Sequence, residues 1–127
     1  MSGIIILAED DPMIQRLLSR MIKRSGYSGN VQTCSDANSA LKFASENSNS
    51  IDLILLDTGL HEKGDAIFFA EIRSIITSAP IFVSSGYSED IIRSETHFGS
   101  SEISGVLSKP FGMNEVKELL TELHLTS

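Results

Sequence analysis

Short, solidly apolar runs alternate along this chain with longer stretches whose apolar residues recur at helical spacing. A solid apolar run predicts a strand covered on both faces, because such a strand has no side that faces water. We expect five strands, at residues 4–7, 31–34, 51–56, 81–83 and 103–107, the second more polar and therefore at a sheet edge. Amphipathic helices are expected to follow them, with apolar positions within 13–22, 40–44, 67–76 and 116–123 and a weaker helix over about 89–97.

Local signals mark where two of these helices begin. Pro12 suits a first helical turn, where its missing N–H has no helical partner to lose. Asp36 can cap the second helix with its side-chain oxygen. The first helix is expected to bury one apolar stripe, which comprises Met13, Ile14, Leu17, Leu18, Met21 and Ile22.

Strands that alternate with helices predict an α/β fold in which a parallel sheet carries helices on both faces. The expected class is a doubly wound, flavodoxin-like (βα)5 three-layer sandwich with five parallel strands in the order 2-1-3-4-5. The 127 residues suffice for one such domain and are too few for two, so a single domain over 1–127 is expected. Ligands of such sheets bind beyond the carboxyl ends of the strands, here between the first and third strands.

The net charge and the cysteine content exclude several kinds of partner and site. The formal net charge is −7, which repels nucleic acid and anionic membrane surfaces. Cys34 is the one cysteine, so an intrachain disulfide and a cysteine-ligated zinc site are both excluded. The first residues do not read as a signal peptide and no apolar run reaches bilayer length, so a cytoplasmic protein without membrane insertion is expected.

Polar and charged residues follow the predicted strands at their carboxyl ends. In chain order these residues are Glu9, Asp10 and Asp11, then Asp57, then Ser84 and Ser85, and finally Lys109. Because the carboxyl ends of parallel strands meet at one edge, we expect Glu9, Asp10 and Asp57 to face one another. Ser85 and Lys109 are expected to form the opposite wall of the same crevice.

Carboxylates gathered in this way need a positive partner. Two of them about 5 Å apart repel by roughly 3 kcal/mol at an effective dielectric constant near 20. A Mg²⁺ ion held by one or two carboxylates, by water and by a phosphate oxygen removes this cost. A carboxylate, a hydroxyl group, an ammonium group and Mg²⁺ together suit phosphoryl transfer, in which a carboxylate can itself be the nucleophile.

Four segments, in this order and spacing, resemble the receiver domain of two-component response regulators: ILAEDDP, LILLD, VSSGYS and LSKPF. The resemblance covers essentially the whole chain. It implies that Asp57 is the phosphoacceptor. It also implies that Asp10 ligates Mg²⁺ directly, that Glu9 does so through water, and that the backbone carbonyl of Gly59 is a further ligand.

The same resemblance assigns roles to the other wall. Ser85 corresponds to the hydroxyl residue that turns towards the phosphoryl group. Lys109 corresponds to the lysine that pairs with the phosphoryl group, and the Lys109–Pro110 bond resembles one that is cis in the family.

The resemblance implies a function in two-component signal transduction. A histidine kinase or histidine phosphotransfer protein would donate a phosphoryl group to Asp57 in a Mg²⁺-dependent reaction, with Mn²⁺ as a substitute. The modified chain would switch a face that binds a downstream protein target, with a homodimer as a further option and no nucleic acid as a partner. It would catalyse its own phosphorylation and dephosphorylation without being an enzyme with a separate substrate. A stand-alone regulator and a receiver from a hybrid kinase or larger regulator are both open.

The sequence departs from the family pattern at three places. His61 stands where family members usually have proline, and Gly64-Asp65 reads as their usual acid–glycine pair exchanged. Val106 stands where a Tyr or Phe ring commonly moves with the switch. Either another side chain, with Tyr87 a candidate, is expected to carry the signal, or the coupling to the output differs.

Three other interpretations are open. A degenerate receiver would bind partners without phosphorylation, which Val106 favours and the intact acids oppose. A phosphohydrolase of the haloacid dehalogenase type needs a second acid two residues after its nucleophile, where this chain has Gly59. A flavodoxin-like binding module needs a first loop rich in Ser, Thr and Gly, whereas the acids at 9–11 would repel a phosphate.

Overall fold

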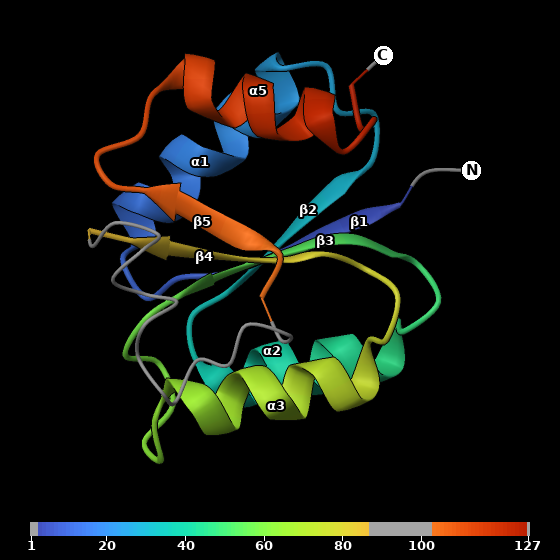
Figure 1. The fold of residues 1–127 in the computed structure, drawn as a ribbon, viewed down its shortest axis with the longest axis vertical. Helices are drawn as coiled ribbons and strands as arrows, with labels where there is room; N and C mark the ends of the chain where they lie inside the picture. Colours follow the sequence, from blue (N-terminus) through green and yellow to red (C-terminus); the bar gives the residue numbers. More distant parts are fainter. Residues whose placement is uncertain (1–2, 87–102, 127) are drawn as a thin grey trace.

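One parallel, five-stranded sheet lies between two layers of helices in the computed structural model, which describes residues 3–86 and 103–126 (Figure 1). The elements are β1 (Ile4–Ala8), α1 (Pro12–Arg24), β2 (Asn30–Cys34), α2 (Ala37–Glu46), β3 (Ile51–Asp57), α3 (Asp65–Ile75), β4 (Ile81–Ser85), β5 (Gly105–Ser108) and α5 (Met113–Glu122). The strand order β2-β1-β3-β4-β5, with every pair parallel, confirms the predicted fold class and the edge position of the second strand.

The two helix layers bury the two faces of the sheet separately. Helices α1 and α5 cover one face, and α2 and α3 cover the other (Figure 1). Successive side chains of a strand point to opposite faces, so Ile5 and Leu7 pack under α1 and α5 while Ile6 packs against α2 and α3. Such strands read as solid apolar runs, which is why the sequence predicted them.

Side-chain caps start the first two helices; the Asp36 cap and the place of Pro12 were predicted, whereas the Asp11 cap was not. The Met13 N–H donates to Asp11 Oδ1 at 2.9 Å, and Pro12 is the first residue of α1. The Ser39 N–H donates to Asp36 Oδ1 at 2.7 Å at the start of α2. These caps fix where each chain segment turns away from the carboxyl edge of the sheet.

Two local predictions were wrong. The apolar stripe of α1 is narrower than expected, because Leu18 and Ile22 are buried whereas Met13 and Leu17 are 68% and 45% exposed. The last strand begins at Gly105, and Ile103 is buried just before it.

The predicted helix over about 89–97 lies outside the described residues, as does Tyr87. Among the described helices, none has the length and apolar character needed to cross a bilayer.

Candidate functional site

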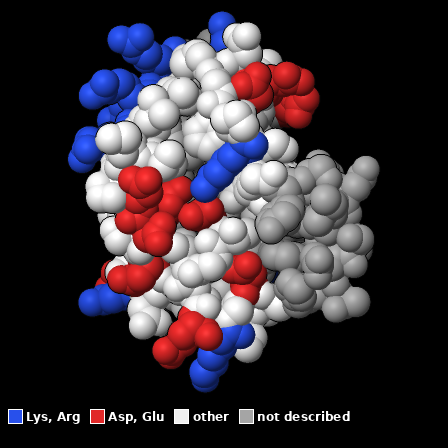
Figure 2. Space-filling model, turned by 90° about the vertical axis from the view of Figure 1, so that its left-hand side faces the viewer, with Lys and Arg blue, Asp and Glu red and all other residues white. Residues whose placement is uncertain are grey.

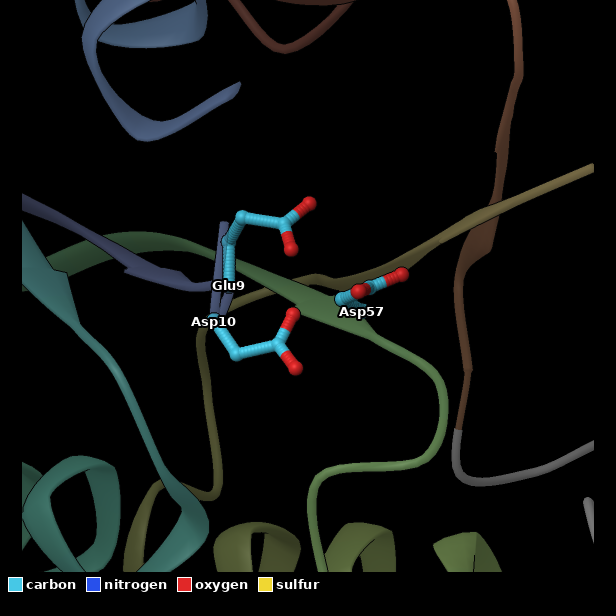
Figure 3. A group of neighbouring side chains, drawn as sticks. All are labelled: Glu9, Asp10 and Asp57. Atoms are coloured by element: carbon cyan, nitrogen blue, oxygen red, sulfur yellow. The ribbon is translucent and has the colours of Figure 1, made fainter. Parts of the chain in front are cut away.

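Three carboxylates meet at the carboxyl edge of the sheet, as the strand ends predicted. Glu9 and Asp10 follow β1, and Asp57 is the last residue of the neighbouring β3. One oxygen atom of each lies within 4.8 Å of the others. Figure 3 shows the Glu9 and Asp10 carboxyl groups directed to the same side, towards Asp57. Figure 2 shows this face of the molecule, where acidic side chains gather beside basic ones.

The two acids after β1 differ in depth. Glu9 is 3% exposed, whereas Asp10 is exposed. Backbone contacts fix Glu9: its N–H donates to the Cys34 carbonyl at 2.9 Å, and its Oε2 accepts from the Asp11 N–H at 3.2 Å. The side-chain amide of Gln15 donates to the Glu9 carbonyl. Asp10 is therefore the acid that an ion from solvent meets first, and Glu9 lies behind it.

Lys109 closes the carboxylate cluster from the end of β5. Its Nζ donates to Asp57 Oδ1 at 3.0 Å and lies 3.5 Å from Glu9 Oε1. Its backbone N–H donates to the Ser85 carbonyl at 2.7 Å, and the Lys109–Pro110 bond is cis. Burial by itself would lower the pKa of Lys109, but the hydrogen bond to Asp57 and the charges of Asp57 and Glu9 raise it above its usual value. The lysine is therefore a permanent cation in this site.

The two hydroxyl residues of β4 occupy different positions. Ser84 is the register partner of Asp57, and Ser85 is that of Ser108. Strand alternation puts Ser84 on the same face as Phe82, which packs under α1 and α5, and Ser85 on the other face. Both are buried, and Ser84 Oγ has no hydrogen-bond partner among the described residues. The sequence favoured Ser85 as the hydroxyl residue of the site and left Ser84 as the alternative. The role of Ser85 stays a prediction. The strand register, which pairs Ser84 with Asp57, draws attention to Ser84 as well.

Ser84→Ala is expected to raise the free energy of unfolding by about 1 kcal/mol, because it removes a buried hydroxyl without a hydrogen-bond partner in the described part of the chain. Urea unfolding in metal-free buffer measures this change. Ser85→Ala serves as the matched control at the next position of the strand. A Ser84→Ala protein less stable than the parent would show that this hydroxyl is satisfied in solution.

The buried Glu9 carboxyl has an unusual proton affinity. Desolvation by burial raises its pKa to about 7; the neighbouring Asp57 charge acts in the same direction, and the Asp11 N–H and Lys109 oppose it. Folding therefore favours the neutral form of Glu9 in the metal-free protein. The resulting destabilisation is absent below the usual pKa of a glutamate and grows as the pH rises towards 7.

We expect the metal-free protein to lose about 2 kcal/mol of stability between pH 5 and pH 8 through Glu9 alone. The measurement is urea unfolding in EDTA at both pH values, compared with Glu9→Gln, which cannot titrate. The pH dependence of the parent should exceed that of the variant in this direction. Equal pH dependence in the two proteins would contradict the raised pKa.

The loop after β3 contains the remaining predicted ligand. Gly59 lies two residues after Asp57 with φ 81°, a left-handed conformation that favours glycine. Its N–H donates to Asp65 Oδ1 at 2.8 Å, a contact that sequence reasoning missed. Val106 is half-buried in β5 and packs on the core under α2 and α3.

The donor set of the cluster fits a small, hard cation. All three groups are carboxylates, one of them exposed to solvent, and Mg²⁺ binds through one or two carboxylates while it keeps several waters. Lys109 Nζ, 3.0 Å from Asp57 Oδ1 and 3.5 Å from Glu9 Oε1, already supplies one positive charge beside the cluster.

The fold and the strand-end residues define a doubly wound α/β domain with acids and a lysine at the carboxyl edge of its five-stranded sheet, and comparison with known proteins gives the family. The model of the response regulator receiver domain matches residues 5–121, so the chain belongs to that family. A two-component response regulator of rice, ORR21 of Oryza sativa subsp. indica, is 28% identical over 116 residues. That match covers 91% of this chain and 16% of the rice protein, so the chain spans a small part of that relative.

Solved structures share the fold over their full length. The chemotaxis response regulator CheY4 of Vibrio cholerae is 19% identical, with a TM-score of 0.80 over 97% of this chain and 99% of that one. The receiver domain of the hybrid histidine kinase CckA is 21% identical, with a TM-score of 0.75 over 95% and 98%. The response regulator TrrA of Thermotoga maritima, solved in complex with Mg²⁺ and BeF, is 26% identical, with a TM-score of 0.76 over 95% and 98%.

Proposed function

We propose that this chain is a phosphorylation-switched receiver that accepts a phosphoryl group on Asp57 from a phosphohistidine of a histidine kinase or phosphotransfer protein. The observation that carries the proposal is the meeting of Glu9, Asp10 and Asp57 within 4.8 Å, with Lys109 Nζ 3.0 Å from Asp57 Oδ1. Receivers in the family, including TrrA in its complex with Mg²⁺ and BeF, supply the precedent. The chain has no separate substrate and is not an enzyme in that sense.

Each residue of the site has its own role in the proposed in-line displacement at phosphorus. A free carboxylate oxygen of Asp57 attacks the phosphorus, the bond from phosphorus to the imidazole nitrogen breaks, and the imidazole leaves. Lys109 neutralises charge on the transferring oxygens, since its pKa keeps it protonated. Asp10 and Asp57, with Glu9 behind them and the Gly59 carbonyl, would hold Mg²⁺, which supplies further neutralisation of the phosphoryl oxygens when bound.

The modification then changes a protein-binding face. A phosphoryl group adds a charge of about −1.5 to −2 beside Lys109. The backbone bond from Lys109 to Ser85 links the site to the ends of β4 and β5. A downstream protein, or a second copy of the chain, is the proposed reader of that change. Two-component signalling through a cytoplasmic receiver is the setting that this function implies.

Incubation with acetyl phosphate in Mg²⁺ and in EDTA, followed by intact mass, tests the proposal. We expect a mass gain of one phosphoryl group in Mg²⁺ and none in EDTA, with Mn²⁺ able to replace Mg²⁺. The same reaction with a phosphorylated kinase or phosphotransfer domain tests the donor. Unmodified protein under all these conditions, together with no metal binding, would instead favour a degenerate receiver.

A further inference from the structure

The β3–α3 loop differs from the family pattern in sequence and is tied to α3 by two side-chain contacts. This loop, residues 58–64, contains two glycines with positive φ, Gly59 at 81° and Gly64 at 105°. Neither has an atom within 4 Å of where a Cβ would stand, so their backbone conformation, not crowding, favours glycine. Side chains from α3 and from the loop itself hold the turn.

The first of these contacts, called a tie here, is a hydrogen bond between the start of α3 and Gly59, whose carbonyl is the candidate metal ligand. Asp65 is the first residue of α3, and its Oδ1 accepts the Gly59 N–H at 2.8 Å. The N-cap residue of α3 is Gly64, which has no side chain and makes no side-chain cap. The Asp65 carboxylate instead accepts a hydrogen bond from the other end of the loop. The usual family order, with glycine at this position, could not make this bond. The exchanged pair therefore places an acceptor where the family pattern has none.

The second tie is made by His61. The Lys63 N–H donates to His61 Nδ1 at 3.0 Å, so the ring proton of the neutral imidazole is on Nε2. That Nε2 lies 2.9 Å from Glu71 Oε1 and donates to it. The His61 side chain is only 10% exposed, and its ring centroid lies 6.0 Å from that of the fully buried Phe68. Proline, usual here in the family, could make none of these hydrogen bonds.

These two ties bracket two consecutive peptide units, Gly59–Leu60 and Leu60–His61. The first unit carries the Gly59 carbonyl, which lies between the anchored Gly59 N–H and the anchored His61 side chain. Contacts to Asp65 and Glu71 hold the two anchors to α3. A carbonyl between two fixed points loses little freedom when it binds an ion, and such preorganisation favours binding.

We propose that Asp65 and His61 are positioning residues that hold the Gly59 carbonyl ready to bind the divalent cation. This inference rests on the proposed function, because it deepens the account of that metal site. The departures from the family pattern at these positions are then a replacement clamp and not a loss of the site. A clamp with only a structural role would support the loop without changing cation affinity.

Asp65→Ala and Asp65→Asn separate the hydrogen bond from the charge. Both variants lose the same charge, but asparagine keeps a side-chain oxygen that can accept the Gly59 N–H. Since one hydrogen bond contributes on the order of threefold to tenfold in an equilibrium, we expect Mg²⁺ to bind Asp65→Ala about fivefold more weakly than Asp65→Asn. Isothermal titration calorimetry with Mg²⁺ measures both. Glu62→Ala, which removes an exposed carboxylate of the same loop, is the control for nonspecific charge loss.

The His61 tie has an equivalent pair. Glu71→Gln keeps an acceptor for His61 Nε2, whereas Glu71→Ala removes it, and Glu71 lies on α3 away from the carboxylate cluster. We expect the alanine variant to bind Mg²⁺ about threefold more weakly than the glutamine variant. Amide hydrogen exchange of Gly59 in the metal-free protein gives a second readout, with faster exchange in Asp65→Ala than in Asp65→Asn.

Each outcome decides the proposal. Weaker Mg²⁺ binding together with faster Gly59 exchange in the alanine variant supports the clamp. Faster exchange with equal Mg²⁺ affinity shows a tie that is only structural and overturns the positioning role, and equal exchange overturns the tie itself. A parent protein that binds no Mg²⁺ overturns the proposed function as well, which distinguishes that failure from a failure of the clamp.

Discussion

Asp57→Asn is expected to abolish phosphoryl incorporation from acetyl phosphate, a loss of at least about a thousandfold in rate. An amide oxygen is a far weaker nucleophile than a carboxylate. The variant should fold, because asparagine has nearly the same shape and keeps an oxygen for Lys109 Nζ, which lies 3.0 Å from Asp57 Oδ1. Intact mass after incubation in Mg²⁺ measures the loss.

One neighbouring acid provides the matched control for this variant, and a second tests the metal site. Asp11→Asn removes an acid of the same run that caps α1, and asparagine also caps helices, so phosphorylation should persist. Asp10→Asn removes the exposed acid of the cluster, so its phosphorylation should fall at low Mg²⁺ and recover in part at high Mg²⁺. Phosphorylation of Asp57→Asn at the parental rate would place the acceptor elsewhere.

The fold could be predicted because burial decides most of it. Strands covered on both faces must be apolar throughout, so the runs at Ile4 and Ile51 were visible without any tertiary information. The helix stripe was less reliable, since an apolar periodicity does not say which of its positions the neighbouring elements cover. Met13 and Leu17 belong to the periodicity and are exposed.

The site was predictable to the level of strand ends and no further. The carboxyl-edge rule brought Glu9, Asp10 and Asp57 together, and the structure has them within 4.8 Å. It could not say that Glu9 is buried while Asp10 is exposed, because that depends on how the chain turns after β1. It also could not choose between neighbouring hydroxyls, since a one-residue change in register exchanges the faces of a strand.

The contacts made by the loop after β3 could not be predicted from the sequence, for a different reason. The bond from Gly59 to Asp65 and the pair of His61 with Glu71 depend on where α3 lies relative to the loop. Sequence comparison marked these positions only as departures. The side-chain geometry turns the same departures into a specific arrangement.

Removal of the fixed cation should separate phosphoryl transfer from metal binding. Lys109→Ala is expected to lower the rate of phosphorylation by about a hundredfold, the usual effect of losing one group that stabilises transition-state charge. The same substitution should strengthen Mg²⁺ binding severalfold, because an ammonium group 3.0 Å from Asp57 Oδ1 and 3.5 Å from Glu9 Oε1 competes with the ion for these carboxylates.

Opposite signs in the two measurements are the informative feature of this prediction. Calorimetry with Mg²⁺ and intact mass after acetyl phosphate treatment can be made on one preparation, and Lys117→Ala on the exposed side of α5 removes the same charge away from the site. A variant that merely unfolds would lose both activities, whereas one that loses only transfer retains the cluster. Weaker Mg²⁺ binding by folded Lys109→Ala would show that the lysine holds the carboxylates in place for the ion. In that case its main contribution would be to gather Asp57 and Glu9, and the transferring phosphoryl group would depend on the divalent cation for most of its neutralisation.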